Sequence, residues 1–539
     1  MSEFLRAPVD PLEGPSFALG GRIVTMNDDT DVIDDGVVYV AQGAIVAVEE
    51  AGAPPPPGFH GLKVLQTKGT IYPGLIDLHD HLSYNALQLW DVPKKYTNRD
   101  QWAKGDTYRK LITGPMKALA HTPKYVPAIV RYVECKCLVA GTTTTQGIAL
   151  SSYAGIQRFY RGIVRNVEQT DDPELPEAGT HISDVEAKDR AKFLKRLDSL
   201  DCLLLHLSEG VDDAAREHFL ALEGPDGKWA IRDSLAGIHC VALRPEDFDV
   251  LAQNGASMVW SPLSNLLLYG KTADVEAARA AGVLVALGPD WSPSGSKNLL
   301  GELKFARLVS SLDGNGLSDV EILALATRSA AKILRWQDHL GCLQPGKRAD
   351  LLVAGGKSGE AHAHLLTRSE GDIELVVVNG VPRYGNATVM ERLLGTDAGE
   401  RASIAGKERR LNLAQKTADP LVSALTLKEA TDLLRDGLER LPDLAKDLLK
   451  RPAADPDAVF LVLDHEDDEN GELRPHLPGP NGELTAAVTA DAAATPLSDL
   501  LVPLELDALT VVDDDRFVDA LAKEKNLPTD VAKQVKELF

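Results

Sequence analysis

The sequence predicts an α/β protein built around a (β/α)₈ TIM barrel, with a small β-sandwich domain made from both flanks of the barrel and a C-terminal α+β extension. Three observations carry this prediction. Apolar runs alternate with longer amphipathic stretches over residues 71–335, short strands with polar turns lie on both sides of that region, and an acidic segment follows at residues 399–539.

The two flanks, residues 1–70 and 336–398, both show short β-branched runs separated by small polar turns, a pattern typical of antiparallel strands. Asn379-Gly380 between two such runs is a strong hairpin signal, because both residues tolerate the backbone of a tight turn. We expect the two flanks to join in one composite β domain. The strands expected in it are Gly21–Met26, Val37–Ala41, Ala44–Glu49, Lys63–Gln66, Leu351–Val353 and Leu375–Val378.

Residues 71–335 predict the barrel itself. Parallel strands joined by helical crossovers are buried on both faces, so they appear as continuous apolar runs, and the length of this region fits one barrel of about 250 residues. Helices such as Asp212–Leu222 and Thr272–Ala280 are expected between the strands. The candidate strands are Ile71–Leu78, Thr142–Ile148, Gly162–Val167, Cys202–His206, Ala236–Val241, Ser257–Ser261 and Val283–Gly288.

The extension, residues 399–539, carries no catalytic motif. We expect an amphipathic helix over Leu427–Leu441, with Thr426 and Glu429 as its capping box. A strand over Phe460–Leu463 and a helix over Arg516–Phe539 are expected to follow. The role of this segment is left open between a docking module and an oligomerisation module, so a homo-oligomer is one outcome to test.

Composition limits the partners and the location. The 539 residues include 57 basic and 80 acidic side chains, so the net charge of -23 repels the phosphates of nucleic acids and anionic membranes. Five scattered cysteines suit a reducing compartment. The N-terminus lacks the basic and apolar regions of a signal peptide, and no run approaches ~18 apolar residues. We expect a cytoplasmic protein that acts on a small molecule and binds neither nucleic acid nor a membrane.

The residues suited to chemistry stand at the ends of candidate strands. His79 and His81 end the first run, and residues two apart on a strand point to the same face, so the two imidazoles could hold one metal ion. His206, His239 and Asp290 each end a later apolar run. A single polar residue at the end of an apolar run is weak evidence for a metal site. The prediction rests on the repetition of this pattern along the chain.

The spacing of these residues matches the repeat of the barrel. From His81 to His206 are 125 residues, four βα units of ~31 residues. From His206 to His239 are 33 residues, one unit, and from His239 to Asp290 are 51 residues, two short units. We therefore place them at the ends of strands 1, 5, 6 and 8, which a closed barrel brings to one mouth. Glu209, three residues after His206, is a candidate to move protons between a metal-activated water and a leaving nitrogen.

These motifs resemble the amidohydrolase superfamily, specifically its branch of cytosine-deaminase-like and triazine-hydrolase-like metal-dependent hydrolases. The resemblance covers about residues 18–395 and is specific for the superfamily, but it does not identify a substrate. It rests on the motifs Pro73-Gly74-Leu75-Ile76-Asp77-Leu78-His79-Asp80-His81, His206-Leu207-Ser208-Glu209, His239, Ser261-Pro262-Leu263-Ser264-Asn265, Leu287-Gly288-Pro289-Asp290-Trp291 and Gly346-Lys347-Arg348-Ala349-Asp350-Leu351.

The resemblance implies one metal site. His79, His81, His206 and Asp290 would bind a single divalent ion per chain, and Asp290 would also orient the attacking water and take a proton. Zinc is the expected ion, with iron and manganese as alternatives that bind similar ligands. Two-metal members use a carboxylated lysine on strand 4. The run interpreted as that strand, Gly162–Val167, contains no lysine, so we expect one ion.

Other residues receive roles in catalysis and in the pocket. The resemblance implies that Glu209 shuttles protons and that His239 holds the water or the developing oxyanion, with contact to the metal ion left open as a further role. It also implies that Asn265 lines the pocket. Trp90 and Trp291 follow the first and the last ligand strands, and aromatic side chains at the mouth of a barrel suit a flat, partly apolar substrate.

The expected activity is hydrolysis of a carbon–nitrogen bond other than a peptide bond, by hydroxide generated at the metal. The first expectation within this class is a deaminase that acts on an aminated heterocycle or a cyclic amidine. An amidase or a dehalogenating hydrolase would use the same site. A non-catalytic scaffold is the alternative from another class, although all implied metal ligands are present. Glu209 favours a leaving group that needs a proton. Pro289 stands where relatives carry Thr or Ser, so this position supplies no hydrogen bond to Asp290.

Overall fold

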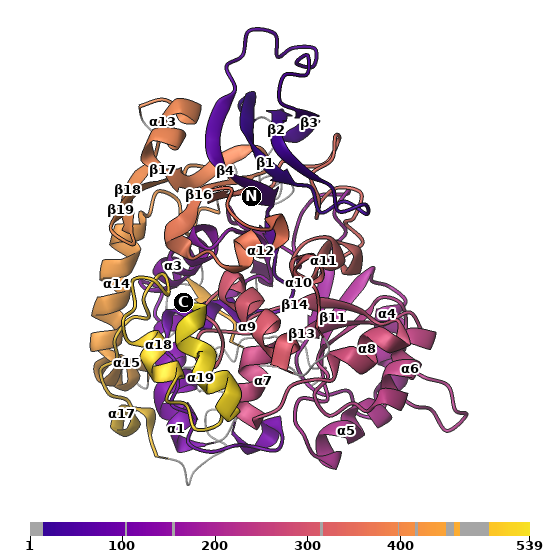
Figure 1. Cartoon of the computed structure of the whole chain (residues 1–539). Coiled ribbons are helices and arrows are strands. Elements are labelled where there is room, and N and C mark those ends of the chain that lie inside the picture. The colour runs from indigo at the N-terminus through magenta and orange to yellow at the C-terminus, as the bar shows by residue number, and fades with distance from the viewer. Residues whose placement is uncertain are drawn as a thin grey trace.

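The computed structural model describes residues 14–102, 105–152, 157–312, 316–396, 398–415, 419–448, 458–463 and 495–539. Most of the strands belong either to a mixed sheet that holds the N-terminal strands or to a group of parallel strands deeper in the molecule (Figure 1). The residues suited to chemistry lie at the ends of the parallel strands, so these strands position the site.

Strands from both flanks of the barrel region share one nine-stranded sheet with β18 and β19, which belong to the segment predicted as the extension. Its strands are β1 (Phe17–Val24), β2 (Val32–Ala41), β3 (Ala44–Glu50), β4 (Leu65–Pro73), β15 (Leu351–Gly355), β16 (Ile373–Val378), β17 (Val381–Asn386), β18 (Glu400–Ile404) and β19 (Lys407–Leu411). β4 pairs in parallel with β1 and antiparallel with β15, so the two flanks meet inside the sheet. Asn379-Gly380 joins β16 to β17 with φ angles of 47° and 74°, which confirms the predicted tight turn. The described residues place these strands in one sheet, and the sandwich stays a prediction.

Eight strands run parallel in two sheets, β5-β6-β9 and β10-β11-β12-β13-β14. They are β5 (Leu75–Ile76), β6 (Thr142–Thr145), β9 (Arg165–Asn166), β10 (Ala178–His181), β11 (Cys202–Leu207), β12 (Leu235–His239), β13 (Ser257–Trp260) and β14 (Leu284–Leu287). Backbone hydrogen bonds link the two sheets on both sides, from Ala178 N to Val167 O (2.8 Å) and from Asp290 N to His79 O (3.0 Å). Within the described residues the strands form two arcs of TIM-barrel type and not one continuous barrel, and the predicted α/β class with a parallel sheet is confirmed.

The run predicted as one strand, Ile71–Leu78, is divided between two sheets. Its first residues end β4 in the nine-stranded sheet, and its next residues are β5, which pairs with β6. Pro73 has no amide hydrogen with which to continue a ladder. Gly74 lies so close to Thr143 that a Cβ at this position would overlap that side chain. One apolar run therefore contains a change of sheet, which hydrophobic periodicity cannot reveal.

The order of the parallel strands corrects a second prediction. Gly162–Val167 contains the third strand, β9, because β9 pairs with β6. The fourth is β10, at Ala178–His181, which pairs with β11 and which the sequence analysis did not identify. β10 has no apolar run, since Gly179 and Thr180 occupy its centre and both are only partly buried. β10 also contains no lysine, so the prediction of a single metal ion now depends on this strand.

Helices surround the parallel strands and fill the connections (Figure 1). They are α1 (Asp106–Tyr108), α2 (Gly114–Ala120), α3 (Val126–Val139), α4 (Arg190–Leu197), α5 (Asp213–Leu220), α6 (Pro245–Gln253), α7 (Pro262–Tyr269), α8 (Val275–Ala281), α9 (Leu299–Leu312), α10 (Asp319–Leu325), α11 (Arg328–Ile333), α12 (Ala361–Leu366) and α13 (Ala387–Leu394), with short 3-10 helices at η2 (Leu82–Ala86), η3 (Arg99–Gln101) and η5 (Glu370–Asp372) and a π-helix at η4 (Arg109–Thr113). Among the described residues, no helix combines the length and the hydropathy needed to cross a bilayer.

The extension packs back onto the rest of the chain. Its elements beyond β19 are α14 (Leu427–Glu439), α15 (Leu441–Leu448), β20 (Val459–Leu461), α17 (Leu497–Leu500), α18 (Phe517–Leu521) and α19 (Thr529–Leu538), and β20 pairs with β7 (Ala149–Ser152), which also pairs with β8 (Gln157–Phe159). α14 contacts α3, and α19 contacts α9. Thr426 and Glu429 form the predicted capping box. The helix predicted over Arg516–Phe539 is two helices, α18 and α19, and Pro528 caps the second.

Candidate metal centre

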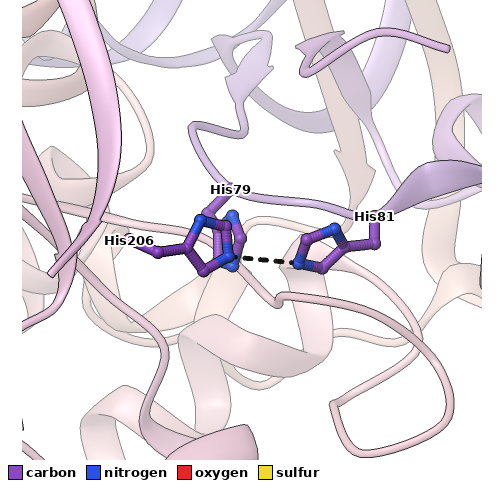
Figure 2. A group of neighbouring side chains, drawn as sticks. All are labelled: His79, His81 and His206. Atoms are coloured by element: carbon purple, nitrogen blue, oxygen red, sulfur yellow. Dashed lines mark hydrogen bonds between the residues drawn. The ribbon is translucent and has the colours of Figure 1, made fainter. Parts of the chain in front are cut away.

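The polar residues at the strand ends converge on one point. His79 and His81 follow β5, and His206 lies in β11. His239 ends β12, and Asp290 follows β14. The candidate ligand atoms of His79, His81 and His206 lie within 4.8 Å of one another (Figure 2), and those of His79, His239 and Asp290 do so as well. The structure thus brings together the side chains that the sequence assigns to a metal site.

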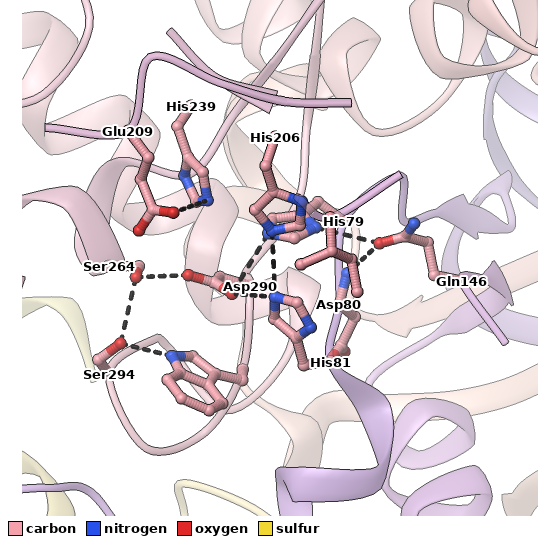
Figure 3. Close-up of polar contacts among 12 residues, drawn as sticks. His79, Asp80, His81, Gln146, His206, Glu209, His239, Ser264, Asp290 and Ser294 are labelled. Carbon is pink, nitrogen blue, oxygen red and sulfur yellow. Dashed lines mark hydrogen bonds and ion pairs between the residues drawn. The ribbon is translucent and has the colours of Figure 1, made fainter. Parts of the chain in front are cut away.

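The distances between these atoms fit one shared ion. Asp290 Oδ1 lies 3.3 Å from both His79 Nε2 and His81 Nε2. His81 Nε2 lies 3.3 Å from His206 Nε2 (Figure 3). Ligand atoms held ~2.1 Å from one tetrahedral zinc ion lie roughly 3.4 Å apart. Within the described part of the chain, the buried His79 Nε2 also has no hydrogen-bond partner, although buried polar atoms normally find one. These donors therefore fit a divalent cation.

Burial sets the protonation states that such an ion requires. The pKa of His206 lies far below its ordinary value because the ring is buried and because His79 and His81 lie beside it. Burial also lowers the pKa of His239. For Asp290, burial acts to raise the pKa, but the neighbouring imidazoles, His79 foremost, hold it below its ordinary value. Neutral imidazoles and an ionised carboxylate are the forms that bind a metal ion.

Hydrogen bonds orient two of the candidate ligands. Gln146 Oε1 accepts from the backbone N–H of Asp80 at 3.0 Å, so the oxygen of this amide faces the site. The same oxygen lies 3.0 Å from His79 Nδ1, which therefore carries the proton and leaves Nε2 as the ligand atom. Ser264 Oγ donates to Asp290 Oδ2 at 2.6 Å. The other carboxylate oxygen, Oδ1, therefore remains on the side of His79 and His81, where it can bind the same ion.

The backbone is strained at two residues of the site. His239 has a φ of 68° and Asp290 a φ of 71°, values that residues other than glycine rarely adopt. Such strain persists only where the surrounding structure imposes it, and it is concentrated at functional sites. Pro289 supplies no hydrogen bond to Asp290, and Ser264 at the start of α7 supplies one from a different element.

Glu209 lies in the same cavity and is held by a separate row of donors. Tyr269 Oη donates to Glu209 Oε1 at 2.7 Å, and Trp102 Nε1 donates to Tyr269 Oη at 3.0 Å. Glu209 Oε2 lies 3.8 Å from His239 Nε2 and 4.0 Å from the Arg99 guanidinium. Burial raises the pKa of Glu209, and Arg99 opposes that increase. A carboxylate with a raised pKa is suited to accept a proton and return it near neutral pH.

A chain of donors determines which nitrogen of His239 carries the proton. The Trp260 indole can only donate, and it donates to Thr272 Oγ1 at 2.7 Å. Thr272 in turn donates to Asn265 Oδ1 at 3.3 Å, so the amide nitrogen of Asn265 faces His239 Nδ1 at 3.0 Å. His239 Nδ1 is therefore the acceptor, and Nε2 carries the proton. In this form Nε2 is a hydrogen-bond donor on the side of Glu209 and not a metal ligand.

A cavity of about 240 Å³ lies against these side chains. Sequence reasoning missed Arg99, Trp102 and Tyr108, which lie in the long connection between β5 and β6 and belong to no periodic pattern. The residues that line the cavity are His81, Arg99, Asp100, Trp102, Tyr108, Thr113, Ile182, His206, Glu209, His239, Leu268, Asp290 and Trp291.

Of the three residues predicted to bind substrate, Trp291 lies at the wall of this cavity and the other two do not. Trp90 is buried against Tyr96 and Tyr108, with ring centroids 6.4 Å and 5.6 Å away. Asn265 faces His239 Nδ1, on the side of the ring away from the cavity. Trp90 therefore packs behind Tyr108, and Asn265 lies behind His239, both of which line the cavity.

Known proteins share this sequence pattern and fold. The profile of the amidohydrolase family matches residues 206–383. A 5-methylthioadenosine/S-adenosylhomocysteine deaminase of Caldanaerobacter subterraneus subsp. tengcongensis is 34% identical over 153 residues, which are 26% of this chain and 35% of that relative. The deaminase of the same name from Thermoanaerobacter pseudethanolicus is 23% identical over 404 residues, 66% of this chain and 91% of the relative. The crystal structure of an adenosine deaminase from Xanthomonas campestris with bound zinc covers 80% of this chain and 99% of its own, with a TM-score of 0.58 and 17% identity.

Residues 206–383 match the amidohydrolase family, which confirms the resemblance that the motifs predict. The predicted enzyme class, a metal-dependent hydrolase of carbon–nitrogen bonds, is confirmed with it. The zinc in the structural neighbour and the histidine-rich site of this chain together support a divalent metal ion.

Proposed function

We propose that this protein is a zinc-dependent deaminase that hydrolyses the exocyclic carbon–nitrogen bond of an aminated heterocycle, with the adenine ring of a nucleoside as the substrate class. The observation that carries the proposal is the convergence of His79, His81, His206 and Asp290 on one point beside Glu209. The names of the two relatives, deaminases of 5-methylthioadenosine and S-adenosylhomocysteine, support the adenine ring. We expect one zinc ion per chain.

The residues around the cavity can carry out the steps of such a hydrolysis. When bound, a divalent ion lowers the pKa of a water toward ~7 and so provides hydroxide at neutral pH. Asp290 remains ionised and can orient the nucleophile through a hydrogen bond. Glu209 accepts a proton from the nucleophile and returns it to the leaving nitrogen. His239 donates a hydrogen bond from Nε2 to the atom that becomes negatively charged, and removal of such a donor costs ~10²–10³-fold in rate.

The cavity walls suit a flat ring. Trp102 lies 5.0 Å from Tyr108 and 6.3 Å from Trp291 between ring centroids, so the three rings form a continuous aromatic surface. Arg99 and Asp100 add charged groups to the same lining. Aromatic walls with a few polar groups are typical of pockets that bind heterocycles.

The proposal is tested by the product. We would incubate the zinc-loaded protein with adenosine, 5′-methylthioadenosine and S-adenosylhomocysteine, and in parallel with a primary amide and a chlorinated triazine, and measure ammonia and chloride. The proposal predicts ammonia from at least one aminopurine. Chloride release, or ammonia from the amide alone, would instead support the dehalogenase or the amidase. No turnover of any compound by protein with a full metal content would support a non-catalytic scaffold.

Replacement of Glu209 by Gln tests the proton carrier. The variant keeps the shape of the side chain but cannot shuttle a proton, so kcat should fall by ~10²–10⁴-fold while the metal content is retained. The matched control is Glu217→Gln, at an exposed position on α5, which should keep the wild-type kcat. A Glu209→Gln enzyme with wild-type kcat would refute the role of this residue.

A further inference from the structure

Asp507, in the extension, lies buried between two lysines from the barrel region. Its Oδ2 accepts from Lys136 Nζ of α3 at 2.5 Å, and its Oδ1 accepts from Lys297 Nζ. The side chains of all three residues are at most 1% exposed. The backbone N–H of Asp507 also donates to Ala86 O at 3.0 Å, and its carbonyl accepts from Tyr132 Oη at 2.5 Å.

The arrangement leaves Lys136 dependent on Asp507. Lys297 has a second carboxylate, because Lys297 Nζ also donates to Asp514 Oδ2 at 2.8 Å. The other acceptors of Lys136 Nζ are uncharged, namely Asn85 O at 2.9 Å and Ser292 Oγ at 2.7 Å. Among the residues that the structure describes, Asp507 is thus the only anion bonded directly to Lys136 Nζ, and a buried cation that loses such a partner is strongly destabilised. Loss of the Asp507 charge would therefore displace Lys136 or its surroundings.

Lys136 joins the two loops that carry metal ligands. Asn85 belongs to the loop after His81, and Ser292 belongs to the loop after Asp290. The Asn85 side chain ties the same loops together, since its Oδ1 accepts from Ser292 N at 2.8 Å and its Nδ2 donates to Asp80 at 2.9 Å. The Lys136 ammonium group therefore lies where these two loops meet. Its partner Asn85 is four residues after His81 in the sequence, and its partner Ser292 is two residues after Asp290.

We propose that Asp507 is a positioning residue of the metal centre: it fixes Lys136, and Lys136 fixes the loops that carry His81 and Asp290 relative to each other. The inference rests on the proposed metal-dependent function. It gives the extension a role inside this chain, in addition to any role in docking or oligomerisation. Replacement of a group hydrogen-bonded directly to a metal ligand typically changes metal affinity or activity by ~10–100-fold, and for Asp507, which acts through Lys136, we expect the lower end of this range.

The test compares Asp507→Asn with Asp514→Asn in the full-length zinc-loaded protein. Asp514 binds the same Lys297 but makes no bond to Lys136, so the control removes a neighbouring ion pair of the extension without touching the loops. The rate of zinc release to a chromogenic chelator is measured, with circular dichroism to verify folding. Asp507→Asn should release zinc about 10-fold faster or more, and Asp514→Asn should stay within about twofold of the wild type. Equal release rates for the two variants, or an unchanged rate for folded Asp507→Asn, would overturn the proposal.

A second variant keeps the test decisive if Asp507→Asn does not fold. Lys136→Met removes the buried cation while Asp507 keeps its bond to Lys297, so no buried charge is left without a partner. Its zinc release should also be about 10-fold faster, and a wild-type rate would contradict the inference. The zinc-release measurement also separates this proposal from the proposed function. If the wild-type protein binds zinc but deaminates no substrate, the proposed function is overturned. The release rates of the variants then still decide the role of Asp507.

Discussion

His239 Nε2 and Glu209 Oε2 lie 3.8 Å apart, and a separate series of hydrogen bonds holds each side chain. Tyr269 holds one oxygen of Glu209, and Asn265 holds Nδ1 of His239. These hydrogen bonds leave the second carboxylate oxygen and the Nε2 proton facing each other at the cavity. Since both groups are positioned before a substrate arrives, the site does not have to reorganise during the reaction, which is the physical basis of electrostatic catalysis.

The series of hydrogen bonds from Trp260 through Thr272 and Asn265 to His239 predicts the effect of replacing Thr272. Replacement by Val removes the hydroxyl that sets the orientation of the Asn265 amide, so the preference for a proton on His239 Nε2 is lost and kcat should fall by about 10-fold with little change in KM. Thr272→Ser keeps the hydroxyl and should restore kcat. The ¹⁵N chemical shifts of the His239 ring report the tautomer directly, and a Thr272→Val protein with the wild-type tautomer and kcat would refute this role of the series.

The sequence predicts the ligands but not the residues that orient them. His79, His81, His206 and Asp290 stand out because each is a polar residue at the end of an apolar run, and the lengths between them are multiples of one βα unit. The orienting residues carry no such signal, because a Gln, Ser or Tyr acquires its role only from the element that packs beside it. They are Gln146, Ser264 and Tyr269.

Short elements explain where the predicted fold differs from the structure. β10 is four residues long, and its sequence Ala-Gly-Thr-His has no apolar run, so no pattern distinguishes it from a loop. Ile71–Leu78 shows the opposite case, because one apolar run serves two sheets. Apolar periodicity records burial and not the partner that buries a residue, so strand pairing must come from the structure.

The change of sheet at Gly74 is tested by its substitution. Gly74→Ala places a methyl group against Thr143 between β4 and β5, and overpacking of this kind costs ~1–3 kcal/mol of folding free energy. Gly316→Ala is the control, because a Cβ there meets nothing within 4 Å. Urea denaturation should show a lower midpoint for Gly74→Ala only, and equal midpoints for both variants would contradict the close packing.

The fold brings the predicted metal ligands together from three stretches of the chain that lie far apart in the sequence. His81 and Asp290 are more than 200 residues apart in the sequence, yet their ligand atoms lie 3.3 Å from each other. The extension adds Asp507, from beyond the superfamily match, to the loops beside them. An ion bound to such a site stabilises the folded state only, since the unfolded chain cannot offer the same set of ligands.

This coupling predicts that zinc raises the thermal stability of the whole protein. Zinc at ~100 times its dissociation constant adds ~2.7 kcal/mol to the free energy of unfolding, so the midpoint of thermal unfolding should rise on addition of zinc and fall with a chelator. His206→Ala removes a ligand and should show a much smaller change. His362→Ala, outside the site, is the control and should respond like the wild type. An equal zinc response of the His206→Ala protein would contradict the ligand set.

We infer that His79, His81, His206 and Asp290 hold one divalent ion. X-ray diffraction data collected from crystals of the zinc-loaded protein on both sides of the zinc absorption edge test it directly, because the anomalous difference locates the ion without reference to activity. We expect one peak per chain, ~2.0–2.2 Å from the three histidine Nε2 atoms and Asp290 Oδ1. A peak bound by other residues, a second peak in the same cavity, or no peak among these side chains would contradict it.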